Sequence, residues 1–214
     1  MIIISFVSQK GGVGKSTLAR ATAQELKNSG MSVKLADLDT QQGTVTNWHI
    51  RRLQNGFDSI GSVECFGSLQ EAINNIDSYD AIVIDGAGRS SVEVLDIAKI
   101  SDVVVQPSDA NLDALIPANK LMLELIQKEI AFDKLFVALC RVTSENQEKL
   151  AREFLGQAGC NVLDGAIYNK TAYDVAQNDG KTIIETGYKT LDDNAKEIVN
   201  NILVKVKKTY GQKK

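Results

Sequence analysis

Histidine is almost absent from this chain of 214 residues, because His49 is the only one. A single histidine argues against acid–base catalysis by histidine and against a zinc cluster. The three cysteines, Cys65, Cys140 and Cys160, show no C-x-x-C spacing. Scattered thiols of this kind are typical of a reducing compartment, so we expect a cytoplasmic protein and not a disulfide scaffold.

Long hydrophobic runs and a strong net charge are also missing. No apolar run approaches the ~18 residues that a membrane-spanning helix needs. The first apolar segment starts at residue 2, so we expect no leader peptide. The net charge is −3, whereas proteins that coat nucleic acid are usually basic, so any DNA contact should use a local patch. With 43% hydrophobic residues and two prolines, we predict a single domain over residues 1–214.

Short apolar runs alternate with amphipathic stretches along the chain. The predicted strands are residues 1–7, 32–38, 62–66, 80–84, 103–105, 135–140 and 165–168. The predicted helices are residues 18–27, 44–54, 69–76, 92–100, 111–129, 147–156 and 196–210. This alternation predicts an α/β fold with a mostly parallel twisted sheet and helices on both faces. Ligands of such folds bind at the carboxyl ends of the strands.

A glycine-rich segment, SQKGGVGKST, connects the first predicted strand to the first predicted helix. Its glycines let the backbone approach phosphate oxygens closely, and the N-terminus of the following helix favours an anion. Lys15 can reach the β- and γ-phosphates, the Ser16 hydroxyl is the expected magnesium ligand, and Thr17 lies beside the α-phosphate. The predicted nucleotide-binding residues of this segment are Lys10, Gly11, Gly12, Val13, Gly14, Lys15, Ser16 and Thr17.

The standard phosphate-loop pattern, G-x-x-x-x-G-K-[ST], fails here by one residue, because Gln9 occupies the position of its first glycine. The segment KGGVGKST instead resembles the deviant phosphate loop of the ParA/MinD family of ATPases, in which the additional lysine, here Lys10, is the signature. Gln9 before it is similar to the branch that partitions plasmids and chromosomes. The alternative is a glycine turn with two solvated lysines, against which the strand–loop–helix context argues.

Two aspartates, Asp37 and Asp39, stand at the carboxyl end of the second predicted strand and share a face by the alternation of side chains. The segment DLDTQQG resembles the switch I motif of the same family, usually D-x-D-P-Q. The resemblance implies that Asp39 orients the attacking water near the magnesium ion. It implies catalytic roles for Lys10, Lys15 and Asp39. Thr40 replaces the usual proline, so we expect a more mobile switch. The alternative is that both acids are solvated and cap a turn.

Asp85 follows four apolar residues at the end of the fourth predicted strand, which is the Walker B arrangement for holding magnesium directly or through water. The predicted metal ligands are therefore Ser16, Asp39 and Asp85. The next residues, Gly86 to Gly88, resemble switch II of the small plasmid-partition ATPases. Arg89 follows, either as a phosphate sensor, as a partner contact or as an ordinary surface arginine.

Two further segments resemble the family only loosely. Arg141 ends a predicted strand where the family places groups near the base, so we predict that it binds the nucleotide, with a surface arginine as the alternative. Residues 105–113 resemble the strand-end segment at the family's dimer interface, and residues 166–170 its base-flanking loop.

The predicted terminal helix has an apolar stripe and many cations. The stripe consists of Ile198, Ile202, Leu203 and Val206, and the cations are Lys196, Lys205, Lys207, Lys208, Lys213 and Lys214. Three interpretations remain open: a basic helix that contacts DNA phosphates through Lys205, Lys207 and Lys208, a membrane-surface helix, and a helix docked on the core with a solvated face. The stripe lacks tryptophan and phenylalanine anchors, which weakens the membrane interpretation.

The resemblance to the ParA/MinD family implies a function and a set of partners. ATP and Mg²⁺ would bind, and two subunits would form a homodimer around two ATP molecules. That dimer would bind DNA non-specifically, which makes it nucleoid-associated, and a ParB-like or small centromere-binding protein would stimulate slow hydrolysis. We expect no membrane partner. The alternative is a MinD-like or cargo-positioning ATPase that acts on a membrane or an organelle. An iron-sulfur carrier would need a C-x-x-C pair, and an amidoligase a second domain.

Overall fold

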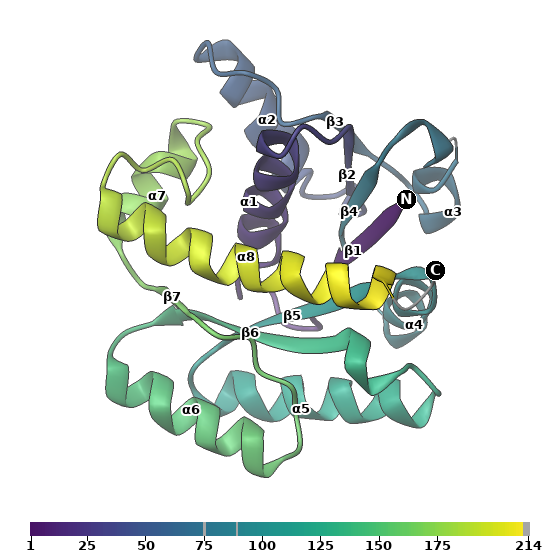
Figure 1. Ribbon diagram of the computed structural model, residues 1–214, viewed down its shortest axis with the longest axis vertical. Helices are drawn as coiled ribbons and strands as arrows, with labels where there is room; N and C mark the ends of the chain where they lie inside the picture. The colour runs from purple at the N-terminus through teal and green to yellow at the C-terminus, as the bar shows by residue number, and fades with distance from the viewer. Residues whose placement is uncertain (75, 89, 212–214) are drawn as a thin grey trace.

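A seven-stranded parallel sheet forms the middle of the computed structural model (Figure 1). Its order is β3-β2-β4-β1-β5-β6-β7. The strands are β1 (Ile2–Phe6), β2 (Val33–Asp37), β3 (Ser62–Cys65), β4 (Ala81–Asp85), β5 (Val103–Asp109), β6 (Leu135–Val142) and β7 (Ile167–Tyr168). The apolar, β-branched β1 pairs with β4 on one side and β5 on the other. The predicted fold class is confirmed.

The structure describes residues 1–74, 76–88 and 90–211. Three cations named in the sequence analysis, Arg89, Lys213 and Lys214, lie outside the described residues.

Helices cover both faces of the sheet, and each face has its own apolar core. One face carries α1 (Lys15–Asn28), α2 (Thr44–Gln54), α7 (Thr171–Asn178) and α8 (Lys189–Gly211). The other carries α3 (Leu69–Ala72), α4 (Ser91–Ile100), α5 (Leu112–Gln127) and α6 (Glu145–Gln157), and the 3₁₀ turns are Ile76–Ser78 and Phe132–Lys134. The alternation along β1 produces this division, because Ile4 and Phe6 pack into the first core while Ile3 packs into the second.

Helix α8 is docked on the core along its apolar stripe. Ile198, Ile202 and Val206 are buried, and Leu203 packs partly against the same core. This packing agrees with the docked-helix interpretation and makes the stripe unavailable to a membrane surface in this fold, whereas the DNA interpretation concerns the lysines and stays a prediction. Among the described residues, no helix combines the length and the apolar character that crossing a bilayer requires.

Several element boundaries differ from the prediction. The strand predicted to end at Val105 continues through Pro107 to Asp109, and α8 begins at Lys189, seven residues before the predicted start. The helix predicted over residues 69–76 is confined to Leu69–Ala72. Helix α7 was not predicted at all, and its residues bear directly on the site.

Candidate nucleotide-binding site

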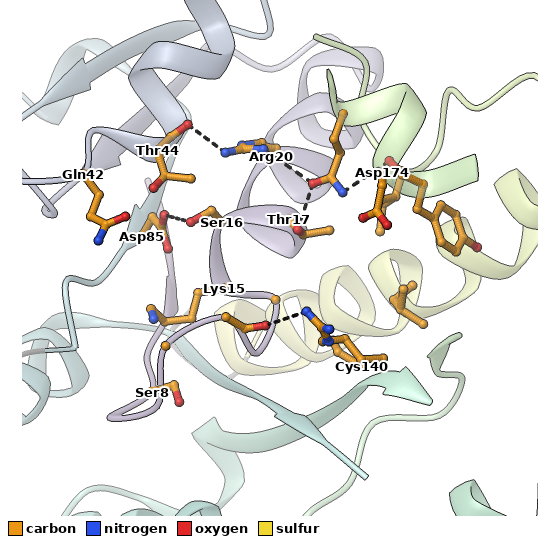
Figure 2. A pocket seen from close by; sticks show the side chains of 18 of the residues that line it. Ser8, Lys15, Ser16, Thr17, Arg20, Gln42, Thr44, Asp85, Cys140 and Asp174 are labelled. Atoms are coloured by element: carbon orange, nitrogen blue, oxygen red, sulfur yellow. Dashed lines mark hydrogen bonds between the residues drawn. The ribbon is translucent and has the colours of Figure 1, made fainter. Parts of the chain in front are cut away.

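A cavity of about 700 Å³ lies at the carboxyl end of the sheet, between the glycine-rich loop, α2, α7 and the ends of β4, β6 and β7 (Figure 2). Its size suits a nucleotide. Most of the predicted site residues line it, namely Lys10, Gly11, Gly12, Gly14, Lys15, Ser16, Thr17, Asp39, Asp85 and Arg141. Val13 also belongs to the loop, but its side chain is buried and does not line the cavity. The lysines of α8 do not line the cavity either.

The glycine-rich loop has a backbone that only glycine adopts easily at two positions. Gly12 and Gly14 have φ values of 74° and 105°, in the left-handed region. A Cβ at Gly14 would also lie 3.2 Å from the Sγ of Cys140. Helix α1 begins at Lys15 without a side-chain cap, so the N–H groups of its first turn have no intrahelical partner. A phosphate group is the natural acceptor for such a helix start.

Ser16 and Asp85 form the part of the cavity that suits a magnesium ion. The Ser16 hydroxyl donates a 2.6 Å hydrogen bond to Oδ2 of Asp85 (Figure 2). The other carboxylate oxygen, Oδ1, is buried and has no hydrogen-bond partner among the described residues. Burial raises the pKa of Asp85 to about 7, which the Ser16 hydrogen bond partly opposes. A hard cation would supply both the missing partner and the compensating charge, so these residues fit Mg²⁺.

The described residues contain no group of three or more histidine, cysteine or acidic side chains that could hold a metal ion by themselves. Mg²⁺ at nucleotide sites is usually bound through one or two protein oxygens together with substrate phosphates and water, and Ser16 and Asp85 offer two such oxygens.

Asp37 and Asp39 lie in different environments, although the sequence predicted a shared face. Asp37 is fully buried, and its carboxylate accepts hydrogen bonds from the N–H groups of Asp39, Val45 and Thr46 at 3.0, 2.9 and 3.4 Å. It therefore fixes the start of α2. Asp39 lies beyond the end of β2 and lines the cavity. Asp37 does cap a turn, as one alternative predicted, but it does so inside the protein.

The segment after β4 passes very close to the glycine-rich loop. Gly88 has a φ of 71°, and a Cβ there would collide with the carbonyl oxygen of Ser8. The same Cβ position lies 3.6 Å from Nζ of Lys15. Any side chain at residue 88 would therefore push the switch-like segment away from the loop and from the lysine.

Two cations flank the loop. The side chain of Arg141 donates from Nη1 to the carbonyl oxygen of Gly12 at 3.4 Å, and its Nε lies 3.8 Å from Oδ1 of Asp109. Its φ of 55° lies in the left-handed region, where the pairing of β6 with β7 shifts register between Cys140 and Val142. Lys10 lies on the opposite side, where its Nζ donates to the carbonyl oxygen of Asp113 at 3.3 Å.

The sequence analysis missed the wall of the cavity formed by Arg20 and α7. Arg20 is buried, lies over the ring of Trp48 at 5.0 Å, and donates from Nη2 to the carbonyl oxygen of Thr44 at 2.8 Å. Burial lowers the pKa of Arg20 to about 10, so the side chain stays charged at neutral pH. Gln177 of α7 accepts a 2.8 Å hydrogen bond from the Thr17 hydroxyl. The available signal was an arginine flanked by Leu18, Ala19 and Ala21 in α1.

The fold and the site together define a class of protein. A parallel sheet with a glycine-rich loop between β1 and α1, and with an acid at the end of β4, is a phosphate-loop nucleotide-binding fold. The family described as the CobQ/CobB/MinD/ParA nucleotide binding domain matches residues 4–183, and the chain belongs to this family.

Individual relatives agree with this assignment. The protein ParA of Rhizobium radiobacter is 27% identical over 181 residues, which cover 81% of each chain. Among solved structures, a putative plasmid partition protein of Borrelia burgdorferi B31 bound to AMPPNP is similar with a TM-score of 0.66 and 21% identity, covering 100% of this chain and 99% of that one. The septum site-determining protein MinD of Pyrococcus horikoshii, complexed with Mg-ADP, has a TM-score of 0.66, 17% identity and coverages of 100% and 98%.

Proposed function

We propose that this protein is an ATP-dependent DNA-partition ATPase that occupies residues 1–214 as a single domain. Its ATP-bound dimer binds DNA non-specifically, and hydrolysis stimulated by a ParB-like or small centromere-binding protein releases it. The observation that carries the proposal is the convergence of Lys10, Lys15, Ser16, Asp39 and Asp85 on one cavity. The similarity to ParA of Rhizobium radiobacter and to the Borrelia plasmid partition protein supports the biological setting.

The residues of the loop would hold ATP and Mg²⁺. The N–H groups at the start of α1 and the ammonium of Lys15 would bind phosphate oxygens, and Ser16 and Asp85 would supply oxygen ligands to the metal. Magnesium supplies charge neutralisation between the phosphates when it is bound. Arg141, which lies against the loop, is available to the nucleotide as well. These contacts would hold the phosphates in place, so the chain would contribute to catalysis mainly by orienting the reacting groups and by stabilising their charge.

Asp39 is the residue that we assign to the attacking water. It lines the cavity and lies next to the start of α2, whose N-terminus is fixed by Asp37. Its backbone carbonyl and side chain accept from the N–H groups of Gln42 and Gly43, at distances of 2.7–3.2 Å. These bonds hold the segment after β2 in a tight turn. A change in that turn would therefore move Asp39 relative to the cavity.

Lys10 is the residue through which we expect nucleotide binding to control dimer formation. Two subunits that face each other across two polyanionic nucleotides need cations at the interface. By resemblance to the family, the ammonium of Lys10 reaches the phosphates of the partner's nucleotide. Lys10→Ala should leave ATP binding to the monomer nearly unchanged and abolish ATP-dependent dimerisation, measured by light scattering with a non-hydrolysable ATP analogue. Wild-type dimerisation by this variant would contradict the proposal.

The test of the whole function is co-sedimentation with ATP in two parallel arms, one with non-specific duplex DNA and one with liposomes that contain anionic lipid. We expect ATP-dependent sedimentation with DNA and none with liposomes, because the apolar stripe of α8 is packed on the core. The opposite pattern would favour the alternative, a MinD-like or cargo-positioning ATPase. Sedimentation with neither would leave the chain an ATPase of this family without the proposed DNA partner.

A further inference from the structure

Helix α5 contains a proline in its interior, Pro117. In an α-helix each carbonyl oxygen accepts from the N–H group four residues later. Pro117 has no N–H group, and the residue four positions before it is Asp113. The helical partner of the Asp113 carbonyl is therefore missing by the covalent structure of the chain.

The ammonium group of Lys10 fills this gap. Its Nζ donates to the Asp113 carbonyl oxygen at 3.3 Å, across 103 positions of sequence. The proline ring also crowds the carbonyl four residues earlier and tilts it outward, which makes that oxygen easier to reach from outside the helix. Lys10 and Pro117 are thus connected through one carbonyl oxygen, although they lie in different elements.

The electrostatic setting makes this acceptor important. Asp113 lies in the first turn of α5, where the helix dipole is positive and repels a cation. The dipole disfavours an ammonium group at this place, and the hydrogen bond to the carbonyl oxygen offsets that repulsion. The acidic side chain of Asp113, in the same first turn, offsets part of the dipole. With any residue other than proline at position 117, the helical N–H group would compete with Lys10 for this carbonyl oxygen and weaken the bond that offsets the repulsion.

We propose that Pro117 is a positioning residue for Lys10. By freeing the Asp113 carbonyl, it holds the Lys10 ammonium on α5 of its own subunit. If Lys10 acts at the dimer interface, as proposed above, dimer assembly has to release Lys10 of each subunit from the Asp113 carbonyl oxygen. Pro117 then raises the apparent dissociation constant of the ATP-bound dimer, because only subunits with a released lysine are competent to dimerise.

The contact itself is tested without nucleotide, by the rate at which a limiting acetylating reagent modifies Lys10. Mass spectrometry measures that rate relative to the exposed Lys120 and Lys149 of the same molecule, whose side chains are 75% and 74% exposed. Two variants, Pro117→Ala and Pro117→Ser, both restore the N–H group but differ in side chain. Pro117 is exposed, so neither change removes a core contact. The matched control is Ile116→Ala, an exposed neighbour that leaves the proline in place.

We expect the relative rate at Lys10 to rise roughly threefold in both proline variants, as the loss of one solvent-exposed hydrogen bond predicts. The Ile116→Ala control should keep the wild-type rate. An unchanged rate at Lys10 in both proline variants would overturn the proposal. A rise in one proline variant only would overturn it too, because the effect would then follow the side chain and not the N–H group.

Dimerisation with a non-hydrolysable ATP analogue tests the consequence separately. If each lysine is released threefold more easily, a dimer that needs two should form about tenfold more tightly in Pro117→Ala. Faster acetylation of Lys10 together with unchanged dimerisation would overturn the regulatory role of Pro117, but it would still support the contact between Lys10 and the Asp113 carbonyl oxygen. Loss of dimerisation in Lys10→Ala is a different result and concerns the proposed function alone.

Discussion

At the scale of single residues, Asp37 and Asp39 show how a shift of two positions along the chain changes what a carboxylate can do. Asp37 is buried and binds three backbone N–H groups, so its oxygens are already used. Asp39 lies outside the strand on the cavity wall. Of the two acids, only Asp39 can face a bound nucleotide without dismantling the start of α2.

Asp39→Ala should therefore retain ATP binding and lose turnover by roughly a hundredfold or more, because a group that orients the attacking water contributes mainly in the transition state. Calorimetry measures the binding and phosphate release measures the turnover. The matched variant is Asp37→Asn, which should lower the free energy of unfolding by about 2 kcal/mol, since a buried carboxylate with three donors is replaced. Wild-type turnover in Asp39→Ala would show that another residue orients the attacking water.

Lys15→Ala is the corresponding prediction for nucleotide capture. A charge-assisted hydrogen bond from an ammonium to a phosphate is worth roughly 1.5–3 kcal/mol, so ATP affinity should fall about tenfold or more. The side chain lines an open cavity, so the variant should fold normally. Calorimetric titration with ATP and Mg²⁺ gives the affinity, and a value equal to that of the wild type would contradict the phosphate-loop assignment.

At the scale of elements, the sequence predicted the sheet well because buried parallel strands are short, continuous apolar runs. It predicted the loop and the Walker B position for a similar reason, because the glycines and the acid follow such runs directly. Asp85 and Gly12 are examples, and both lie at the cavity. The environment of Asp37, by contrast, depends on the backbone of α2, which strand periodicity does not describe.

Pro107 shows why one strand boundary was wrong. The N–H group of Val7 donates to the carbonyl of Val105, so the backbone groups of Val105 point toward β1. Two residues later Pro107 faces the same side, beyond the last paired residues of β1 and β5, so its missing N–H group interrupts no bond of that ladder. The strand continues because its other edge pairs with β6 through Asp109. A proline is tolerated in such a place, although sequence rules treat it as a strand end.

Helix α7 was missed because its eight residues are too short to show a clear helical period. Tertiary contacts hold it in place: the Tyr173 hydroxyl donates to the carbonyl of Leu191 at 2.9 Å, and Thr17 donates to Gln177. Both bonds connect segments that are distant in sequence, and no local pattern announces them. The wall that α7 adds to the cavity could therefore not be predicted from the sequence.

One ion pair connects α2 to the segment after α7. Arg52 is 3% exposed and donates to both carboxylate oxygens of Glu185 at 2.8 and 2.9 Å. It also donates to the carbonyl oxygens of Asp58 and Gly180. Burial alone would raise the pKa of Glu185, but the hydrogen bonds from Arg52 and Thr182 outweigh it, and the pKa lies below its ordinary value of 4.5.

Because the folded-state pKa of Glu185 is lowered, the stabilisation is present above pH 4.5 and is lost as the pH falls through the folded-state value. Glu185→Gln should lower the free energy of unfolding by about 3 kcal/mol at pH 7, since Arg52 remains buried without its counter-charge. The difference from the wild type should shrink on acidification. Urea denaturation at several pH values measures it. The control is Glu153→Gln, whose exposed pair with Lys149 should contribute almost nothing. If the difference in unfolding free energy between the wild type and Glu185→Gln grew toward acid pH, the stabilising ion pair between Arg52 and Glu185 would be contradicted.

At the scale of the whole molecule, charge is unevenly distributed along α8. From Ile198 to Lys208 the helix contains Lys205, Lys207 and Lys208 and no acidic residue. Lys207 and Lys208 are exposed, and Lys205 is half-buried over the ring of Phe136 at 5.4 Å. Figure 1 shows α7, which lines the cavity, near the first turns of α8, whereas the three lysines belong to the opposite end of the helix. A chain with a net charge of −3 thus carries a local basic patch away from its nucleotide cavity.

If this patch neutralises DNA phosphates, affinity for non-specific DNA should fall steeply with salt, because each neutralised phosphate releases counterions. Changing Lys205, Lys207 and Lys208 together to glutamate should abolish ATP-dependent DNA binding and leave ATP hydrolysis without DNA unchanged, because none of the three lines the cavity. The measurement is co-sedimentation at several salt concentrations, together with phosphate release.

The matched control reverses three exposed lysines on the opposite layer, Lys120, Lys128 and Lys149 of the α5–α6 side. This control makes the same change in net charge. A general electrostatic effect would weaken DNA binding by both variants equally, whereas a local contact surface on α8 would weaken DNA binding by the α8 variant only. Retained binding in the α8 variant would show that the docked helix serves the core alone, and would direct the search for the DNA surface to Lys170, Lys181 and Lys189. Those lysines lie on or beside α7 and α8 at the nucleotide end, so DNA binding there would be coupled to ATP through the cavity wall itself.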